Sequence, residues 1–160
     1  MGLDMYLSKK TYVKNWAHQD VTEKHEITVT LGGKKHPYIK PEKVTYITEE
    51  AGYWRKANHI HVWFVANVQE GQDDCREYEV DLMNLQLLLD TCKSVMENRP
   101  SAELLLPTQS GFFFGGTAYD EYYFSDIEET IAILEEILKH KITTERGVYL
   151  PFEVYYQASW

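Results

Sequence analysis

The sequence predicts a single α+β domain over residues 1–160, with a mainly antiparallel sheet and three helices packed on one face of it. Three observations predict this class. Two runs in the first part of the chain, Met1–Leu7 and His25–Leu31, alternate apolar with polar residues, as half-buried strands do. A Gly32-Gly33 pair follows the second of these runs, which is typical of a tight hairpin. Three further stretches carry apolar residues at helical spacing. We expect strands from the two termini to close the sheet.

The first part of the chain is predicted to be mostly β-structure. Its β-rich runs are bounded by glycine and proline, which punctuate strands and turns. Residues 8–24 are polar with scattered aromatic side chains and show no clear period, so they receive no assignment. The expected strands are Met1–Leu7, His25–Leu31, Lys34–Ile39 and Val44–Thr48.

A helix is predicted over Tyr53–Gln69, with Glu49-Glu50 at its start and Gly71 just past its end. Winding this stretch at about 100° per residue gives one apolar stripe, and His61 and Asn58 fall within it. Buried polar groups need hydrogen-bond partners, so these two residues are either satisfied core groups or the floor of a pocket. The residues expected on the opposite, outer face are Arg55, Lys56, His59, Trp63 and Asn67. Trp63 is exposed there unless a second layer of structure covers it.

The rest of the chain predicts two more helices. Asp81 is a suitable N-cap for a helix running to about Asn98, with Cys92 on its buried side. Ser125 and Glu128 have the spacing of a capping box and predict the start of a third helix. Between and after these helices the expected extended segments are Leu104–Leu106, Gly111–Phe114, Tyr119–Phe124 and Val148–Gln157.

The net charge of −9 is concentrated in the middle of the chain. Residues 68–138 hold 3 Lys/Arg against 16 Asp/Glu, a balance of −13, while residues 1–67 hold 10 against 7. An acidic surface repels nucleic-acid phosphates and favours a basic protein partner. With only 2 cysteines and no apolar run long enough to span a bilayer, we expect free thiols, a cytoplasmic location and no membrane association.

Several linear motifs in the chain resemble those of a known protein group. They are GLDMYL from Gly2, YWRKANHIHVWFV from Tyr53, DDC from Asp73, LLPT from Leu105 and GFFFGGTAYDEYY from Gly111. They are spread from residue 2 to residue 123, and they resemble a family of small uncharacterised proteins of phages, prophages and related mobile elements. The resemblance runs over most of the chain. Some members are labelled phosphoglycerate kinase, but 160 residues are too few for that enzyme's two large domains. The resemblance therefore implies a phage-type setting and no particular reaction.

The candidate site residues surround the predicted helix over Tyr53–Gln69. His59 and His61 cannot chelate one metal from a helix, because residues two apart point in different directions. We predict no metal and no cofactor. For chemistry, His61 would need an acid or a thiol from elsewhere, and the candidates are Asp74, Cys75 and Asp120. The candidate ligand-binding residues are Trp54, Arg55, Lys56, Asn58, His61, Trp63 and Tyr119.

Two functional hypotheses follow. The first is a non-enzymatic, phage-type protein that uses its acidic surface to bind a host macromolecule, or that binds a small ligand. The alternative is a small enzyme or nucleotide-handling protein with a pocket around His61, Asp74 and Asp120. The sequence predicts no oligomeric state.

Overall fold

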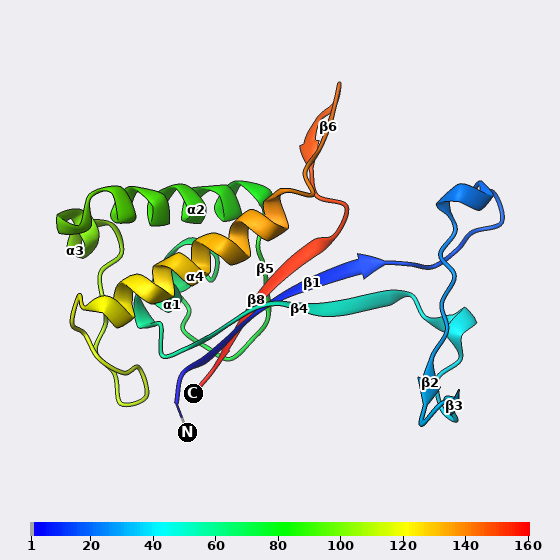
Figure 1. Cartoon of the computed structure of the whole chain (residues 1–160), viewed down its shortest axis with the longest axis horizontal. Helices are drawn as coiled ribbons and strands as arrows, with labels where there is room; N and C mark the ends of the chain where they lie inside the picture. Colours follow the sequence, from blue (N-terminus) through cyan, green and yellow to red (C-terminus); the bar gives the residue numbers. More distant parts are fainter. Residues whose placement is uncertain (1) are drawn as a thin grey trace.

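The computed structural model describes residues 2–160, and a four-stranded antiparallel sheet lies at its centre (Figure 1). The strand order is β4-β1-β8-β5. The strands are β1 (Asp4–Tyr12), β4 (Tyr46–Arg55), β5 (Tyr78–Glu79) and β8 (Glu153–Ser159). The first and last strands are direct neighbours, with Met5 opposite Ala158. The predicted α+β class is confirmed. The strands from the two ends of the chain do not close the sheet as expected, because they pair at its centre and leave β4 and β5 as the edges.

One face of this sheet is covered by helices and the other is open. On the covered face, Met5 pairs with Trp54 and Leu7 with Tyr156, and all four side chains are buried. On the open face Tyr6 and Tyr53 meet with ring centroids 5.4 Å apart. The helices are α1 (Asn58–Asn67), α2 (Leu82–Glu97), α3 (Ala102–Leu105) and α4 (Glu121–Leu138). Three helices were predicted, and α3 is the additional short one.

Helix α2 forms as predicted, because Asp81 caps it. The Asp81 carboxylate accepts a hydrogen bond from the backbone N–H of Asn84 at 2.7 Å. The helix ends at Glu97, with Asn98 as its C-terminal cap, and Cys92 is fully buried on its inner side.

Helix α4 begins earlier than predicted. Asp120 is its N-cap, and the Asp120 carboxylate accepts from the N–H groups of Tyr122 and Tyr123, both at 3.1 Å. The expected extended segment Tyr119–Phe124 is therefore wrong from Glu121 onward. The predicted capping box at Ser125 is also wrong, since that residue lies inside the helix.

The boundary between β4 and α1 corrects the prediction for Tyr53–Gln69. Strand β4 continues through Glu49-Glu50 to Arg55, and α1 occupies only Asn58–Asn67. Lys56 between them has a φ of 62°, in the left-handed region that non-glycine residues seldom adopt. Of the five residues expected on the outer face, His59 and Trp63 are buried, whereas Arg55, Lys56 and Asn67 are exposed.

The segment between α2 and α4 is helical and irregular. A 3-10 turn, η3 (Arg99–Ser101), leads into α3, so the predicted strand Leu104–Leu106 is wrong. The predicted strand Gly111–Phe114 is a turn, with Phe112 96% exposed. The turn requires glycine at position 111, because a Cβ built on Gly111 lies 2.8 Å from the Phe114 ring.

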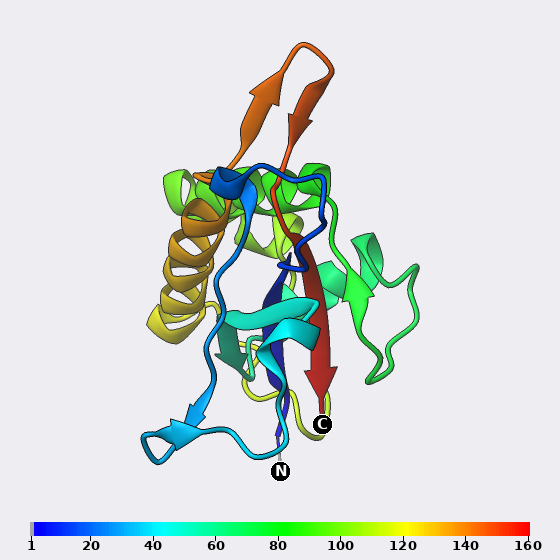
Figure 2. The ribbon, with the colours of Figure 1, turned by 90° about the vertical axis from the view of Figure 1, so that its right-hand side faces the viewer.

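Two hairpins project from the main sheet (Figure 2). Strands β2 (Thr30–Leu31) and β3 (Lys34–Lys35) form the hairpin predicted at Gly32-Gly33, although both are shorter than expected. Strands β6 (Ile142–Thr144) and β7 (Gly147–Tyr149) form the other. The single strand predicted over Val148–Gln157 is thus divided, since Pro151 has no N–H to pair within a ladder.

Residues 8–24 extend β1 to Tyr12 and then form a loop with a 3-10 turn, η1 (Val21–Glu23). A further 3-10 turn, η2 (Pro41–Lys43), precedes β4.

Candidate functional site

The predicted site residues are distributed over a buried histidine chain, a loop network and a surface pocket. His61 belongs to the first. Its Nδ1 lies 2.7 Å from the Tyr156 hydroxyl and its Nε2 lies 2.9 Å from Asp73 Oδ1. A carboxylate only accepts hydrogen bonds, so Nε2–H donates to Asp73 and, in the neutral ring, Nδ1 accepts from Tyr156. Burial lowers the pKa of His61, and the nearby Asp73 charge opposes this effect.

This Tyr156–His61–Asp73 chain has the hydrogen-bond order of a catalytic triad, but a substrate has no access to it. The His61 side chain is 1% exposed and Tyr156 is fully buried, so no reacting group reaches the hydroxyl. Of the two interpretations for His61, the satisfied core group is the one observed.

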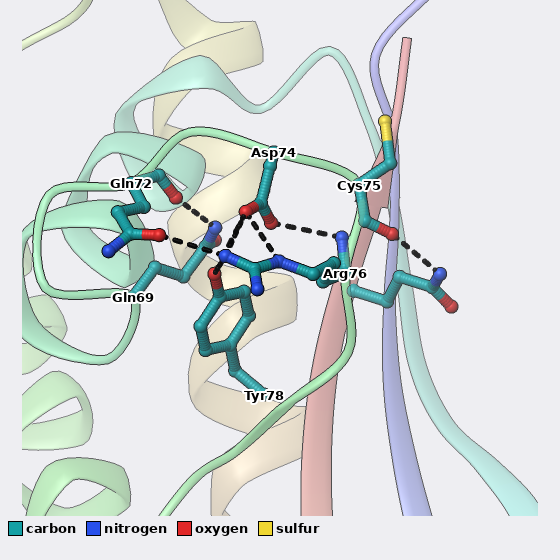
Figure 3. A network of polar contacts seen from close by, with 7 residues as sticks. Gln69, Gln72, Asp74, Cys75, Arg76 and Tyr78 are labelled. Carbon is teal, nitrogen blue, oxygen red and sulfur yellow. Dashed lines mark hydrogen bonds and ion pairs between the residues drawn. The ribbon is translucent and has the colours of Figure 1, made fainter.

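Asp74 and Cys75 belong to the loop network (Figure 3). Asp74 accepts from Arg76 Nε at 2.7 Å and from the Tyr78 hydroxyl at 3.0 Å, and the Arg76 bond holds its pKa below the ordinary value. The Cys75 thiol points away from this network, while the Cys75 carbonyl accepts from Gln157 at 2.8 Å. His61 has no hydrogen bond to Asp74, Cys75 or Asp120 within residues 2–160, so these residues do not form the predicted pocket.

Two predicted ligand-binding tryptophans lie in the core. Trp54 is 2% exposed and its indole N–H donates to Thr130 Oγ1 at 2.9 Å. Trp63 is 7% exposed and packs edge-on against Phe64 at 5.4 Å. Neither side chain is available to a ligand. The large hydrophobic area of both rings, together with the satisfied N–H of Trp54, explains them as core residues.

The remaining predicted residues meet in a surface pocket of about 360 Å³, which we call the β4–α4 pocket. It lies between the end of β4 and the first turns of α4. Four predicted site residues line it: Arg55, Lys56, Asn58 and Asp120. Tyr119 lies beside it, with its ring edge on Tyr123 at 4.9 Å. The other lining residues are His59, Thr108, Gly115, Gly116, Ala118, Tyr122, Tyr123 and Asp126.

Asn58 joins the two sides of this pocket. It is 1% exposed, and its Nδ2 donates to the carbonyls of Phe114 at 3.0 Å and Gly116 at 2.8 Å. Its Oδ1 accepts from the N–H of Gln109 at 2.9 Å. One side chain at the start of α1 therefore fixes the loop that carries the opposite wall.

The backbone around Lys56 is held in an uncommon conformation. The Lys56 N–H donates to Leu3 at 2.8 Å, and its carbonyl accepts from Asn58 at 2.9 Å. Opposite it, Gly115 has a φ of 85°, and a Cβ built there lies 3.0 Å from the Lys56 Cβ. A left-handed lysine costs on the order of 1 kcal/mol and persists only where its surroundings hold it, often at functional sites.

His59 is the most unusual polar group of the pocket. It is 3% exposed and its ring lies 4.2 Å from the Tyr123 ring, centroid to centroid. Its Nε2 is buried and has no hydrogen-bond partner in the described part of the chain. Burial lowers the pKa of His59 to about 3, so the ring is neutral at pH 7.

Asp126 is an unusually weak acid in the wall of the pocket. Burial, together with repulsion from Glu129 and Asp120, raises its pKa to about 6. Sequence reasoning missed Asp126, because the helix was started at Ser125. With the start at Asp120, the i, i+4 spacing from Tyr122 would have placed Asp126 on the face that lines the pocket.

We expect His59→Phe to retain fold stability at pH 7 and to flatten its dependence on pH. The phenyl ring keeps the contact with Tyr123 and removes a buried, unpaired nitrogen. The folded-state pKa of His59 lies below its unfolded value of 6.5. The stability linked to its neutral form is therefore complete above 6.5 and is lost as pH falls toward about 3, at up to about 1.4 kcal/mol per pH unit.

The test is chemical denaturation of both proteins from pH 7 to pH 4, using the difference between their unfolding free energies. Asp126, whose pKa is raised, acts in the opposite direction, since its protonated form favours the folded state as pH falls through about 6. It is present in both proteins and cancels in the difference. His140→Phe, at an exposed histidine, is the control. Parallel profiles for wild type and His59→Phe would contradict the assignment.

No protein-family model, curated protein or solved structure matches the chain. Among the described residues no helix combines the length and apolarity required to cross a membrane. Within residues 2–160 no three His, Cys, Asp or Glu side chains are grouped as metal ligands. The candidate site therefore depends on the geometry of the β4–α4 pocket alone.

Proposed function

We propose that this is a non-enzymatic binding protein that holds a small, negatively charged polar ligand in the β4–α4 pocket. The observation that carries the proposal is the exposed Lys56, which lines the pocket and whose backbone is held at a φ of 62°. Strained backbone of this kind is often found at functional sites. The buried His59 Nε2 is out of a ligand's reach and does not carry the proposal.

The charges favour an anionic group at the Lys56 side of the pocket. Arg55 and Lys56 are both exposed. The Arg55 Nε lies 4.0 Å from Asp4 Oδ1, whereas Lys56 has no ion pair among residues 2–160, so Lys56 offers the free charge. Asp120 and Asp126 line the α4 side, where they would accept hydrogen bonds from donor groups on the same molecule. The ligand class that suits both walls is a small organic carboxylate or phosphate that also carries hydroxyl or amino groups.

The acidic surface supports binding to a host protein less directly. Of the six acids between β4 and α2, Asp73 bonds to His61, Asp74 to Arg76 and Asp81 to the N-terminus of α2, so these three serve the fold itself. Glu77 and Glu79 are exposed and remain candidates for such a contact. The free thiols of Cys75 and Cys92 support a cytoplasmic location. The phage-type resemblance supports a host cell as the source of the ligand.

We expect anionic probes to raise the melting temperature of the protein, since a ligand that binds only the folded state stabilises it. Suitable probes are citrate, inorganic phosphate and adenosine monophosphate, compared with spermidine and glucose at matched ionic strength. Lys56→Gly should weaken binding of the best probe about 10-fold or more, as loss of a charge-assisted contact does. Isothermal titration calorimetry measures this change.

Glu70→Gly is the matched control. Glu70 is the other non-glycine residue with a positive φ, at 54°, and it does not line the pocket. Both substitutions place glycine at a left-handed position, so their effects on stability should be similar. Only Lys56→Gly should change affinity. The proposal is wrong if no anionic probe shifts the wild-type melting temperature, or if Lys56→Gly binds the best probe as wild type does.

A further inference from the structure

Residues 14–45, which we call the arm, leave the body of the molecule between β1 and β4 (Figures 1 and 2). None of these residues is buried. Tyr38 is 88% exposed and Leu31 is 60% exposed. The other exposed large apolar side chains of the arm are Trp16, Val21 and Ile39.

The arm has a definite shape that rests on local hydrogen bonds. Asn15 exchanges two bonds with the His25 backbone, at 2.7 and 2.8 Å. His36 Nδ1 accepts from the N–H groups of Tyr38 and Ile39, both at 3.1 Å. Ordering a backbone costs roughly 1–2 kcal/mol per residue, which burial normally offsets. An ordered arm without a buried residue, and with exposed aromatic and aliphatic side chains, therefore has the character of an interaction surface.

The charge of the arm is opposite to that of the body. The arm holds 6 lysines against 4 acids, a balance of +2. The net charge of the whole chain is −9, so the rest of the chain carries −11. Its distal part, residues 27–43, holds 4 lysines against 1 glutamate. A surface that is both basic and apolar requires a partner that is acidic and apolar.

The body of this same chain offers such a surface at the start of α2. A groove of about 700 Å³ lies there, between α2 and β7. Its apolar lining includes Met83, which is 75% exposed, Leu87 at 47% and Val148 at 49%. Asp81, Asp90 and Lys141 border it, so its charged groups sum to −1.

We propose that the arm of one copy of the protein docks in the α2 groove of a second copy, and that the exchange is reciprocal. Two identical contacts related by a twofold axis close the assembly as a dimer. The arm contains 32 residues (14 through 45), which suits the roughly 20–30 residues per side of a standard interface. This inference does not depend on the ligand pocket, which neither the arm nor the groove lines.

Sedimentation velocity of the full chain over a wide concentration range tests the proposal. We expect a dimer that weakens as salt is added, because charge pairs contribute to it. Lys34→Glu/Lys35→Glu in the arm and Met83→Glu in the groove should each raise the dimer dissociation constant about 10-fold or more. All three residues are exposed, so the variants should melt as wild type does. Lys24→Glu, an exposed arm lysine outside the distal part, is the control.

A charge-reversal pair locates the contact. Asp90→Lys mixed with Lys34→Glu/Lys35→Glu should form a heterodimer more tightly than either variant self-associates, since opposite charges meet in both of its contacts and like charges meet in both contacts of each homodimer. A wild-type monomer at every concentration would overturn the proposal. So would a dimer that all of these variants leave intact, or a monomer whose arm lysines instead bind duplex DNA or anionic vesicles.

Discussion

Replacing His61 by alanine should lower the free energy of unfolding by about 3–5 kcal/mol, the largest effect of any single change considered for this protein. The ring lies between three aromatic neighbours, Phe114 at 5.4 Å, Trp160 at 5.6 Å and Tyr156 at 6.2 Å, centroid to centroid. Its removal leaves a cavity. It also leaves the Tyr156 hydroxyl, which is fully buried, without its partner.

Chemical denaturation at pH 7 measures this loss, and two gentler variants separate its parts. Tyr156→Phe removes only the hydroxyl and should cost about 1–2 kcal/mol, the usual penalty for one unpaired buried acceptor. Asp73→Asn keeps an oxygen that accepts from His61 Nε2 and should cost less than His61→Ala. His140→Ala, at an exposed histidine, is the control. A loss at His61→Ala no larger than that of the control would mean that the histidine chain does not stabilise the core.

The sequence predicted the polar character of the segment around His61 better than its secondary structure. In Gly52–Arg55 burial alternates strictly, with Gly52 and Trp54 buried and Tyr53 and Arg55 exposed. Over so few residues a period of 2 fits a helical stripe as well, so the strand was read as the first turn of the helix. The break at Lys56 gave no signal, since lysine is not a residue that favours a positive φ. Asn58 and His61 were nevertheless identified correctly as inward-facing groups that need partners.

The pocket itself required tertiary information. Arg55, Lys56, Asn58 and Asp120 were all named from the sequence, but the sequence predicted Asn58 and His61 together, either as core groups or as the floor of one pocket. In the structure the two residues face different surroundings: His61 meets β8 through Tyr156, and Asn58 meets the loop after α3 through Phe114 and Gly116. Residues three apart on a helix lie near each other, yet their neighbours are set by how sheet and loop pack around it.

Replacing Asn58 by alanine is the second large effect, and it should connect stability with binding. We expect a loss of about 2–4 kcal/mol, because three backbone groups lose a partner that only an amide of this size supplies. These groups are the carbonyls of Phe114 and Gly116 and the N–H of Gln109. The loop from Gln109 to Gly116 should loosen, and the anionic probe should bind more weakly even where the protein is still folded.

Hydrogen exchange at the Gln109 amide reports the loop directly, and Asn58→Asp makes the test specific. The aspartate keeps the oxygen that accepts from Gln109 but loses both donors and sets a charge against two carbonyls. At pH 7 we expect Asn58→Asp to be no more stable than Asn58→Ala. Burial should raise the pKa of the new carboxyl. The stability of Asn58→Asp relative to Asn58→Ala should therefore increase as the pH is lowered and the acid becomes a donor.

Asn84→Ala is the control. It removes one 3.5 Å bond at the surface and should stay within about 0.5 kcal/mol of wild type. Rapid exchange at Gln109 already in the wild-type protein would show that Asn58 does not hold the pocket wall, and with it the structural basis for a preformed binding site would be lost.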